Sequence, residues 1–250
     1  MKNTLHECRE MLRELVRQRG LDHANVVVRA RPLTPEEAIG SPGRRDFPIL
    51  EGKERVIEAN VMGAHGQAFT DSASDFSGRL SDIMDLPLAD NRSRALFVAT
   101  MNATLRYLGL VKGVIHCKNN DPESCAAEIA AEARKTGAGT VGLVGMNPAI
   151  AEALVREFGA EGVRITDLNP QNIATRKFGV VVMDGRLHTR DLVRASDLIL
   201  VTGTAIVNDT LDDIRSAAQE EGKRLIVFGI TAAGVSYLAG LDRWCPKAQD

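Results

Sequence analysis

The stretch 140–158, TVGLVGMNPAIAEALVREF, constrains the fold more than any other part of the chain. It begins with a short apolar run, VGLV, which is typical of a strand buried on both faces. Gly145 interrupts this run, Asn147 is a favourable helix cap and Pro148 suits the first helical position. Apolar residues then recur at helical spacing until Gly159, where a helix can end. A strand, a glycine turn and a helix in this order predict an open parallel α/β sheet, in which ligands bind beyond the carboxyl ends of the strands.

The rest of the second half repeats the pattern. Apolar runs at 163–167, 197–202 and 225–228 predict further strands, and small hydrogen-bonding residues follow the strand ends. Because the carboxyl ends of parallel strands meet at one edge of a sheet, these residues should line a ligand crevice. The residues of this half that we expect in the crevice are His116, Gly145, Asp167, Asn169, Thr202, Gly203, Thr204, Asn208 and Thr231.

Asp167 lies 22 residues after Gly145. Nucleotide-binding domains place an acid for a ribose hydroxyl at about this distance. The glycine fingerprint of such domains is incomplete, because Gly142 and Gly145 do not form a GxGxxG motif. The hypothesis that the protein is a transferase binding a nucleotide or S-adenosylmethionine therefore rests on Asp167 and on fold analogy alone.

The first half of the chain has a different pattern. Helices are expected at 4–19 and 94–108, strands at 25–31 and 55–62, and a short helix after the cap Thr34. No strand is predicted in the glycine-rich stretch that follows residue 62. That stretch contains GQAFTD, whose small residues allow a close backbone approach and whose Thr70 and Asp71 offer hydrogen bonds to a ligand.

Asn102 lies inside the apolar helix predicted at 94–108. Two interpretations are open: a core residue that satisfies backbone groups, or a contact to a ligand.

Composition excludes several classes of function. A formal net charge of −2 and only 4% aromatic residues give no reason to expect a nucleic-acid or anionic-membrane partner. No apolar run approaches ~20 residues and the N-terminus lacks an apolar signal core, so we expect a cytoplasmic protein with cysteines present as thiols. No GxxxxGK[ST] loop, HExxH pattern or Ser/His/Asp order supports a hydrolase or a kinase.

His116, Cys117 and Cys125 form a His/Cys cluster in the sequence. Imidazole and thiolate ligands suit zinc, copper(I) or nickel, although the spacing is not a standard zinc pattern. Cys125 should lie near the start of a helix at 122–136, where the helix dipole lowers the pKa of a thiol. The alternative is that both cysteines are small buried residues. Cys245 is distant in sequence and could join the cluster in three dimensions.

Motifs in both halves of the chain resemble the putative heavy-metal chelation family, DUF364, whose members carry an enolase N-terminal-like domain, DUF4213. The motifs are LTPEEAIG (33–40), GQAFTD (66–71), ATMNA (99–103), HCKNNDPESCA (116–126), DLNPQNI (167–173), LVTGTAIVNDT (200–210) and VFGITAAGVSYLAGLDRWCP (227–246).

The resemblance implies an enolase N-terminal-like α+β domain at 1–115 and a Rossmann-like parallel α/β domain at 116–250, with a crevice between them. It also implies a pterin-, flavin- or siderophore-like compound or metal chelate as ligand. Relatives place a Gly-His pair after the first strand of the second domain, but this chain has Gly145-Met146, so no role for a histidine there is transferred.

The first functional hypothesis is therefore a protein that binds a small molecule or metal chelate in the crevice, with condensation or hydrolysis as its enzymatic form. The second is a non-catalytic heavy-metal-binding protein that uses His116, Cys117 and Cys125 as ligands. The sequence leaves open whether the protein is an enzyme and whether it forms a homo-oligomer. The cofactor that these hypotheses suggest is a transition metal ion.

Overall fold

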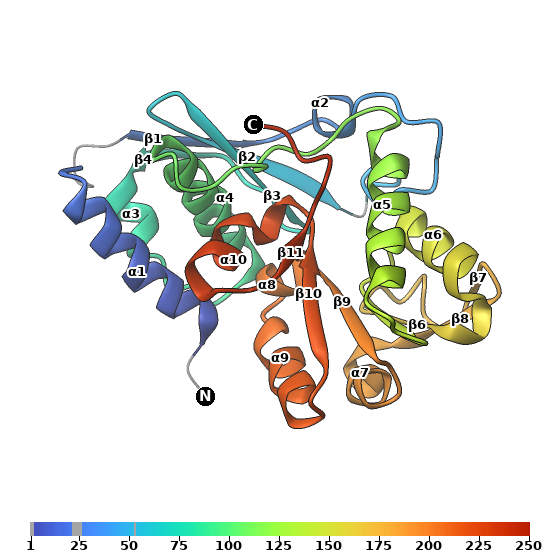
Figure 1. Cartoon of the computed structure of the whole chain (residues 1–250). Coiled ribbons are helices and arrows are strands. Elements are labelled where there is room, and N and C mark those ends of the chain that lie inside the picture. Colours follow the sequence, from blue (N-terminus) through green and yellow to red (C-terminus); the bar gives the residue numbers. More distant parts are fainter. Residues whose placement is uncertain (1–2, 22–26, 53) are drawn as a thin grey trace.

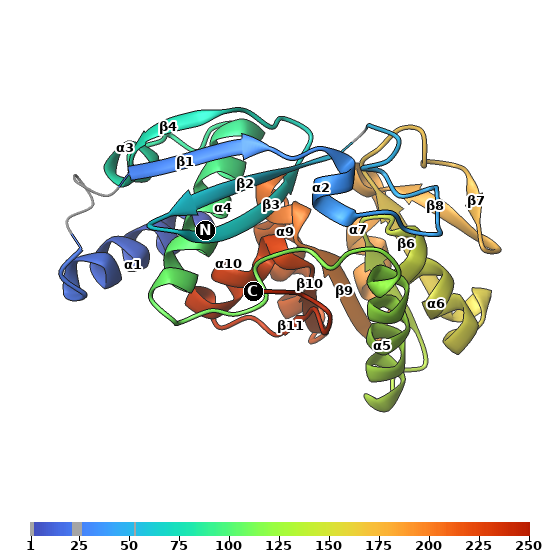
Figure 2. The same ribbon diagram turned by 90° about the horizontal axis from the view of Figure 1, so that it is seen from above.

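The structure is a computed structural model that describes residues 3–21, 27–52 and 54–250, and it contains two β-sheets with helices packed on them (Figure 1). The first sheet is formed by the N-terminal half and has the strand order β3-β2-β1-β4, with antiparallel neighbours. Its strands are β1 (Val27–Pro32), β2 (Arg55–Val61), β3 (Ala64–Thr70) and β4 (Phe76–Arg79). The helices of this half are α1 (Thr4–Gln18), α2 (Pro35–Ile39), α3 (Leu80–Met84) and α4 (Asn91–Tyr107). Figure 2 shows the sheet from above, with α4 beneath it, against β2 and β3.

The second sheet has seven strands in the order β11-β10-β9-β5-β6-β8-β7, and only the edge pair β7–β8 is antiparallel within the described residues. The strands are β5 (Val141–Val144), β6 (Val163–Asp167), β7 (Arg176–Lys177), β8 (Val180–Asp184), β9 (Leu198–Thr202), β10 (Arg224–Phe228) and β11 (Arg243–Trp244). Taken in chain order, β5, β6, β8, β9 and β10 have the spatial order 3-2-1-4-5 that open nucleotide-binding sheets adopt. The chain therefore reverses its winding direction between β5 and β9.

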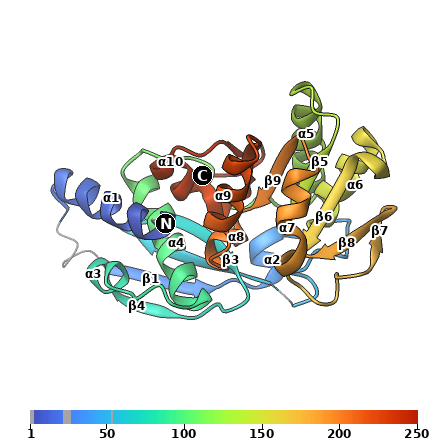
Figure 3. The same ribbon diagram turned by 90° about the horizontal axis from the view of Figure 1, so that it is seen from below.

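Helices cover both faces of this second sheet. The helices are α5 (Asp121–Lys135), α6 (Pro148–Phe158), α7 (Gly185–Arg194), α8 (Thr204–Val207), α9 (Leu211–Glu220) and α10 (Ala233–Ala239). Leu143 of β5 belongs to the hydrophobic cluster that contains α5 and α6, whereas neighbouring Gly142 faces Leu192 of α7. Alternate residues of one strand thus face opposite helix layers, and Figure 3 shows α7 and α9 from below.

The two halves of the chain share their hydrophobic cores. One cluster joins α1 and α4 of the first half to α8, α9 and α10 of the second, and α10 packs against both α1 and α4. Asn102 of α4 lies at this junction with no exposed surface. Its Nδ2 donates to the carbonyl oxygens of Gln67 (2.9 Å) and Ile230 (3.2 Å), and its Oδ1 accepts from the amide of Gly234 (2.8 Å). The structure therefore supports the core interpretation of Asn102.

The α/β class predicted from the sequence is confirmed, and so is the helix start at Thr34, whose side chain forms a capping box with Glu37. No strand was predicted after residue 62, and this was wrong, because β3 and β4 form there. The small residues of β3 do not prevent it from forming a strand, since β3 pairs with β2 and lies close to α4. A Cβ atom on Gly66 would lie only 2.2 Å from the backbone nitrogen of Ala103. Strand β8 and helices α7 and α10 were not predicted either, and Asn25 and Val26 of the expected strand 25–31 lie outside the described residues.

In the part of the chain that the structure describes, none of the helices combines the length and apolarity needed to cross a bilayer. The enolase N-terminal-like character of the first sheet and the boundary between residues 115 and 116 stay predictions.

Candidate functional site

A cavity of about 940 Å³ lies at the carboxyl ends of β5, β6 and β9, where the chain reverses its winding direction. This is the position at which open α/β sheets bind ligands. We call it the crevice, and residues of both halves line it. From the first half come Glu54, Thr70, Asp71 and Asn91; from the second come, among others, Gly145, Asp167, Asn169, Thr202, Thr204 and Asn208. Eight of the sequence-predicted residues are thus brought together, namely Thr70, Asp71, Gly145, Asp167, Asn169, Thr202, Thr204 and Asn208.

Asp167 organises the loops at the bottom of the crevice. Its Oδ2 accepts hydrogen bonds from the backbone amide of Met146 (2.8 Å) and from Nδ2 of Asn172 (3.1 Å), and its Oδ1 accepts from the amide of Asn169 (2.7 Å). The carboxylate therefore joins the turn after β5 to the turn after β6. Three of its roughly four lone-pair positions are used inside the protein.

Two threonine hydroxyls lie at the end of β9. Oγ1 of Thr202 and Oγ1 of Thr204 are 3.0 Å apart, and both side chains are half-buried. Gly145, at the end of the neighbouring strand, has a φ of 91° and packs directly on Thr202. The turn after β5 thus lies against the threonine pair and leaves the hydroxyls at the crevice wall.

Glu54 adds a third carboxyl group to Asp71 and Asp167. Burial, together with the negative charges of Asp167 and Asp71, raises the pKa of Glu54 to about 7. A group of this kind exchanges a proton near neutral pH. Glu54 is not among the residues predicted from the sequence, because a charged residue in a loop is usually solvated and no local pattern distinguishes this one.

Asn91 connects the two halves across the crevice. Its Nδ2 donates to Oδ1 of Asp71 (3.0 Å) and to Oδ1 of Asn208 (3.2 Å). Asn91 is the first residue of α4, a position with no sequence signal for ligand binding.

Four predicted site residues do not line the crevice: Asn102, His116, Gly203 and Thr231. Asn102 is used in the core, as described above. Thr231 is 2% exposed and its Oγ1 accepts from the amide of Phe69 (2.9 Å), so it fastens β3 to the second sheet. Gly203 is buried, and a Cβ there would lie 2.9 Å from the amide nitrogen of Ala232. Gly203 and Thr231 follow the ends of strands, as predicted. The sequence could not predict which of the residues after a strand end face the crevice.

His116, Cys117 and Cys125 lie outside the crevice, and Cys245 joins them. Cys117 and Cys125 are buried and Cys245 is half-buried. The thiols of Cys117 and Cys245 both hydrogen-bond to the sulfur of Cys125. These bonds lower the pKa of Cys125 and raise the pKa values of its two partners, so Cys125 is the most readily deprotonated of the three.

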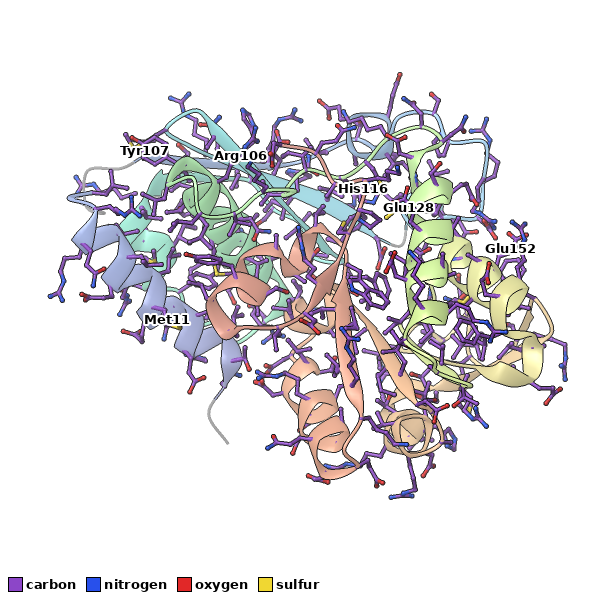
Figure 4. The ribbon with its side chains drawn as sticks, viewed as in Figure 1. Met11, Arg106, Tyr107, His116, Glu128 and Glu152 are labelled. Atoms are coloured by element: carbon purple, nitrogen blue, oxygen red, sulfur yellow. The ribbon has the colours of Figure 1, made fainter. Side chains whose placement is uncertain are left out.

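His116 lies beside α5 (Figure 4), and its ring meets that of Phe69 edge to face, with centroids 5.1 Å apart. Burial lowers the pKa of His116 to about 4, so the ring is neutral at pH 7. Among the described residues, no three His, Cys, Asp or Glu side chains are already arranged to hold a metal ion. A metal at the predicted ligands would therefore require side-chain rotation.

Comparison with known proteins gives a family match for part of the chain and a similar fold. Residues 129–240 match the profile of the family DUF364, described as "Putative heavy-metal chelation". A crystal structure of a DUF364 protein of unknown function from Pyrococcus horikoshii superposes with a TM-score of 0.57 at 16% identity, over 92% of this chain and 80% of that one. A second DUF364 structure of unknown function, from Desulfitobacterium hafniense DCB-2, gives 0.45 at 15% identity, over 76% and 73%.

No curated protein matches the chain. At 16% identity the Pyrococcus structure speaks for the shared fold alone. The resemblance seen in the motifs is confirmed for residues 129–240, the part of the chain that matches the DUF364 profile.

Proposed function

We propose that the protein binds a small polar molecule that carries a cation, such as an organic chelator with its metal ion, in the crevice. The observation that carries this proposal is the convergence of Glu54, Asp71 and Asp167, from both halves of the chain, on one cavity at the switch point of the sheet. The negative charges of Asp71 and Asp167 act on Glu54, and a positive charge among the three carboxyl groups would offset this repulsion. A metal chelate brings such a charge, together with polar atoms on its organic part.

The other walls of the crevice suit the organic part of such a ligand. Thr202 and Thr204 offer hydroxyls that donate and accept, and Asn208 offers a side-chain amide. Donors and acceptors of this kind match the heteroatoms of pterin-, flavin- or siderophore-like compounds. The heavy-metal chelation in the family description agrees with this class of ligand.

Glu54 supports the enzymatic form of the proposal. Hydrolysis or condensation needs a group that gives or takes a proton near neutral pH, and a carboxyl group with a pKa of about 7 does so. In this form Glu54 is the acid or base and Asp71 holds the cation, while the negative charge of Asp167 adds to the attraction.

The nucleotide hypothesis gains less support. An acid that binds a ribose diol needs free lone pairs, but three hydrogen bonds from Met146, Asn169 and Asn172 already occupy the carboxylate of Asp167. Asp167, which suggested this hypothesis, thus serves to connect the turns after β5 and β6.

Native mass spectrometry of untagged, freshly purified protein is the first test, because it reports a retained ligand and the number of subunits together. Calorimetry then compares two probes: the Cu²⁺ complex of 2,2′-bipyridine, which is cationic, and 2,2′-bipyridine without the metal, which is neutral near pH 7. We expect the copper complex to bind more tightly. Asp71→Asn should weaken its binding about tenfold, which corresponds to about 1.4 kcal/mol for the lost charge partner.

Asp85→Asn is the matched control, because Asp85 is an exposed acid at the end of α3, outside the crevice lining. Equal affinity for the two probes would show that the carboxylates do not select a cation. Equal effects of Asp71→Asn and Asp85→Asn would show that the crevice is not the binding site.

A further inference from the structure

The thiol cluster is a second group of reactive side chains, separate from the crevice. It lies where three segments meet: the connection 111–120, helix α5 and the C-terminal segment 243–250. Each segment supplies one cysteine: Cys117, Cys125 and Cys245 respectively. In the described part of the chain, no cysteine lines the crevice.

Backbone and side-chain contacts that involve no cysteine hold these segments together. Ile115 and Gln249 exchange two backbone hydrogen bonds of 2.9 and 2.8 Å, and Nη1 of Arg243 donates to the carbonyl of Gly113 (3.0 Å). Lys247 forms an ion pair of 2.5 Å with Glu128 of α5. Cys245 is therefore brought to Cys117 and Cys125 by contacts on both sides of it along the chain.

Cationic side chains lie near two of the three sulfurs. Arg243 interacts electrostatically with Cys245, and Lys247 with Cys125. Asp121 is the acid that faces Cys117 and opposes this effect. Two cations beside three thiols would partly balance the charge that remains when thiolates bind a divalent ion.

His116 supplies an independent observation. Its Nδ1 is buried and has no hydrogen-bond partner, and the ring is close enough to Cys125 for an electrostatic interaction. A buried nitrogen without a partner is uncommon and costs free energy, so such a group calls for an explanation. A neutral imidazole nitrogen is a good ligand for a metal ion.

We propose that Cys117, Cys125, Cys245 and His116 form a site for a thiophilic divalent metal ion, of which Zn²⁺ and Cd²⁺ are examples. Three sulfur ligands and one imidazole are a donor set that zinc accepts in tetrahedral geometry. The thiols now hydrogen-bond to one another, so binding replaces S–H···S contacts with metal–sulfur bonds, and the thiol protons leave to solvent. The cysteine side chains rotate to converge on the ion, since they are not arranged around it beforehand.

Titration of the reduced full-length protein with Cd²⁺ tests the site, because thiolate–cadmium bonds give an ultraviolet charge-transfer band. We expect one ion per chain and a band that reflects three sulfur ligands. Cys245→Ser, at the half-buried position, should lower the affinity roughly 100-fold or more, because a hydroxyl is a poor ligand for a soft ion. Cys8→Ser is the matched control, since Cys8 is a buried cysteine in the core around α1 and should leave the band unchanged.

A second measurement needs no variant. Bound Cd²⁺ should protect Cys117, Cys125 and Cys245 from alkylation in peptide maps of the unaltered protein, while Cys8 shows no cadmium-dependent change. The proposal is wrong if Cd²⁺ gives no charge-transfer band, if Cys245→Ser binds Cd²⁺ as tightly as the unaltered protein, or if cadmium protects no cysteine. Asp71→Asn, which tests the crevice, should not affect cadmium binding, so the two proposals can fail separately.

Discussion

Gly145 and Thr202 lie so close together that a Cβ atom on residue 145 would be 2.3 Å from Cγ2 of Thr202. They end the two neighbouring strands between which the sheet reverses its winding direction. Gly145 also has a φ of 91°, which L-residues with a side chain rarely adopt. Contact and conformation together explain why the turn after β5 requires glycine.

Gly145→Ala should therefore lower the free energy of unfolding by about 1–3 kcal/mol, from backbone strain and from the clash with Thr202. Urea denaturation measures this loss. Thr202→Ser removes Cγ2, the closest atom, so the double variant should lose less stability than the sum of the two single variants. Strictly additive losses would mean that the contact does not matter.

Asn102→Ala should destabilise the protein by about 2–5 kcal/mol. The change leaves the amide of Gly234 and the carbonyl groups of Gln67 and Ile230 without their partner in a fully buried position. Urea denaturation again measures the effect. Asn60→Ala, at a half-buried position on β2, is the control and should cost about 1 kcal/mol or less. A loss from Asn102→Ala no larger than that of the control would contradict the core role.

Glu54 should make stability depend on pH in an unusual direction. Its pKa is about 7 in the folded protein, above the 4.5 of an unfolded chain, so the folded state binds the proton more tightly. The stability from this group is complete below pH 4.5 and is lost as the pH rises to 7, by up to about 1.4 kcal/mol per pH unit.

Glu54→Gln keeps the shape of the side chain and removes the titration. The variant should gain stability relative to the unaltered protein as the pH rises from 4.5 to 7, as measured by chemical denaturation at several pH values. Parallel pH profiles for the two proteins would show that the carboxyl group of Glu54 is not perturbed. Glu51→Gln, three residues earlier, provides a comparison at an exposed position.

Arg44 should matter more than other charged surface residues. Its side chain is 15% exposed, and its guanidinium contacts Glu123 of α5, Glu152 of α6 and Asp46 (3.2 Å), so it attaches the loop beside the crevice to two helices. Arg44→Met should cost about 1–3 kcal/mol at low salt, because the acids lose a shared cation. Arg17→Met, in an exposed pair with Glu14, should cost about 0.5 kcal/mol or less. Similar losses in urea denaturation would show that burial gives Arg44 no special weight.

Local patterns predicted the α/β class and many elements correctly because those patterns act over short distances. The cap and glycines around α6 and the capping box of Thr34 depend on neighbours within a few residues. Strand β3 was missed because its small residues are held by β2 and α4 rather than by local propensity. The periodicity of a sequence does not reveal contacts of this kind between distant segments.

The candidate site, like the fold, was predicted in part from the sequence and in part revealed only by the tertiary structure. The sequence by itself determined that polar residues such as Thr204 follow parallel strands, which leads to one edge of a sheet and to a crevice there. Only the tertiary structure decided that Glu54 and Asn91 join that crevice, that Thr231 and Asn102 turn into the core, and that Cys245 meets Cys125. The physical reason is that these contacts join residues far apart in the chain: the burial of Glu54 and the thiol hydrogen bonds arise only when both halves have packed together.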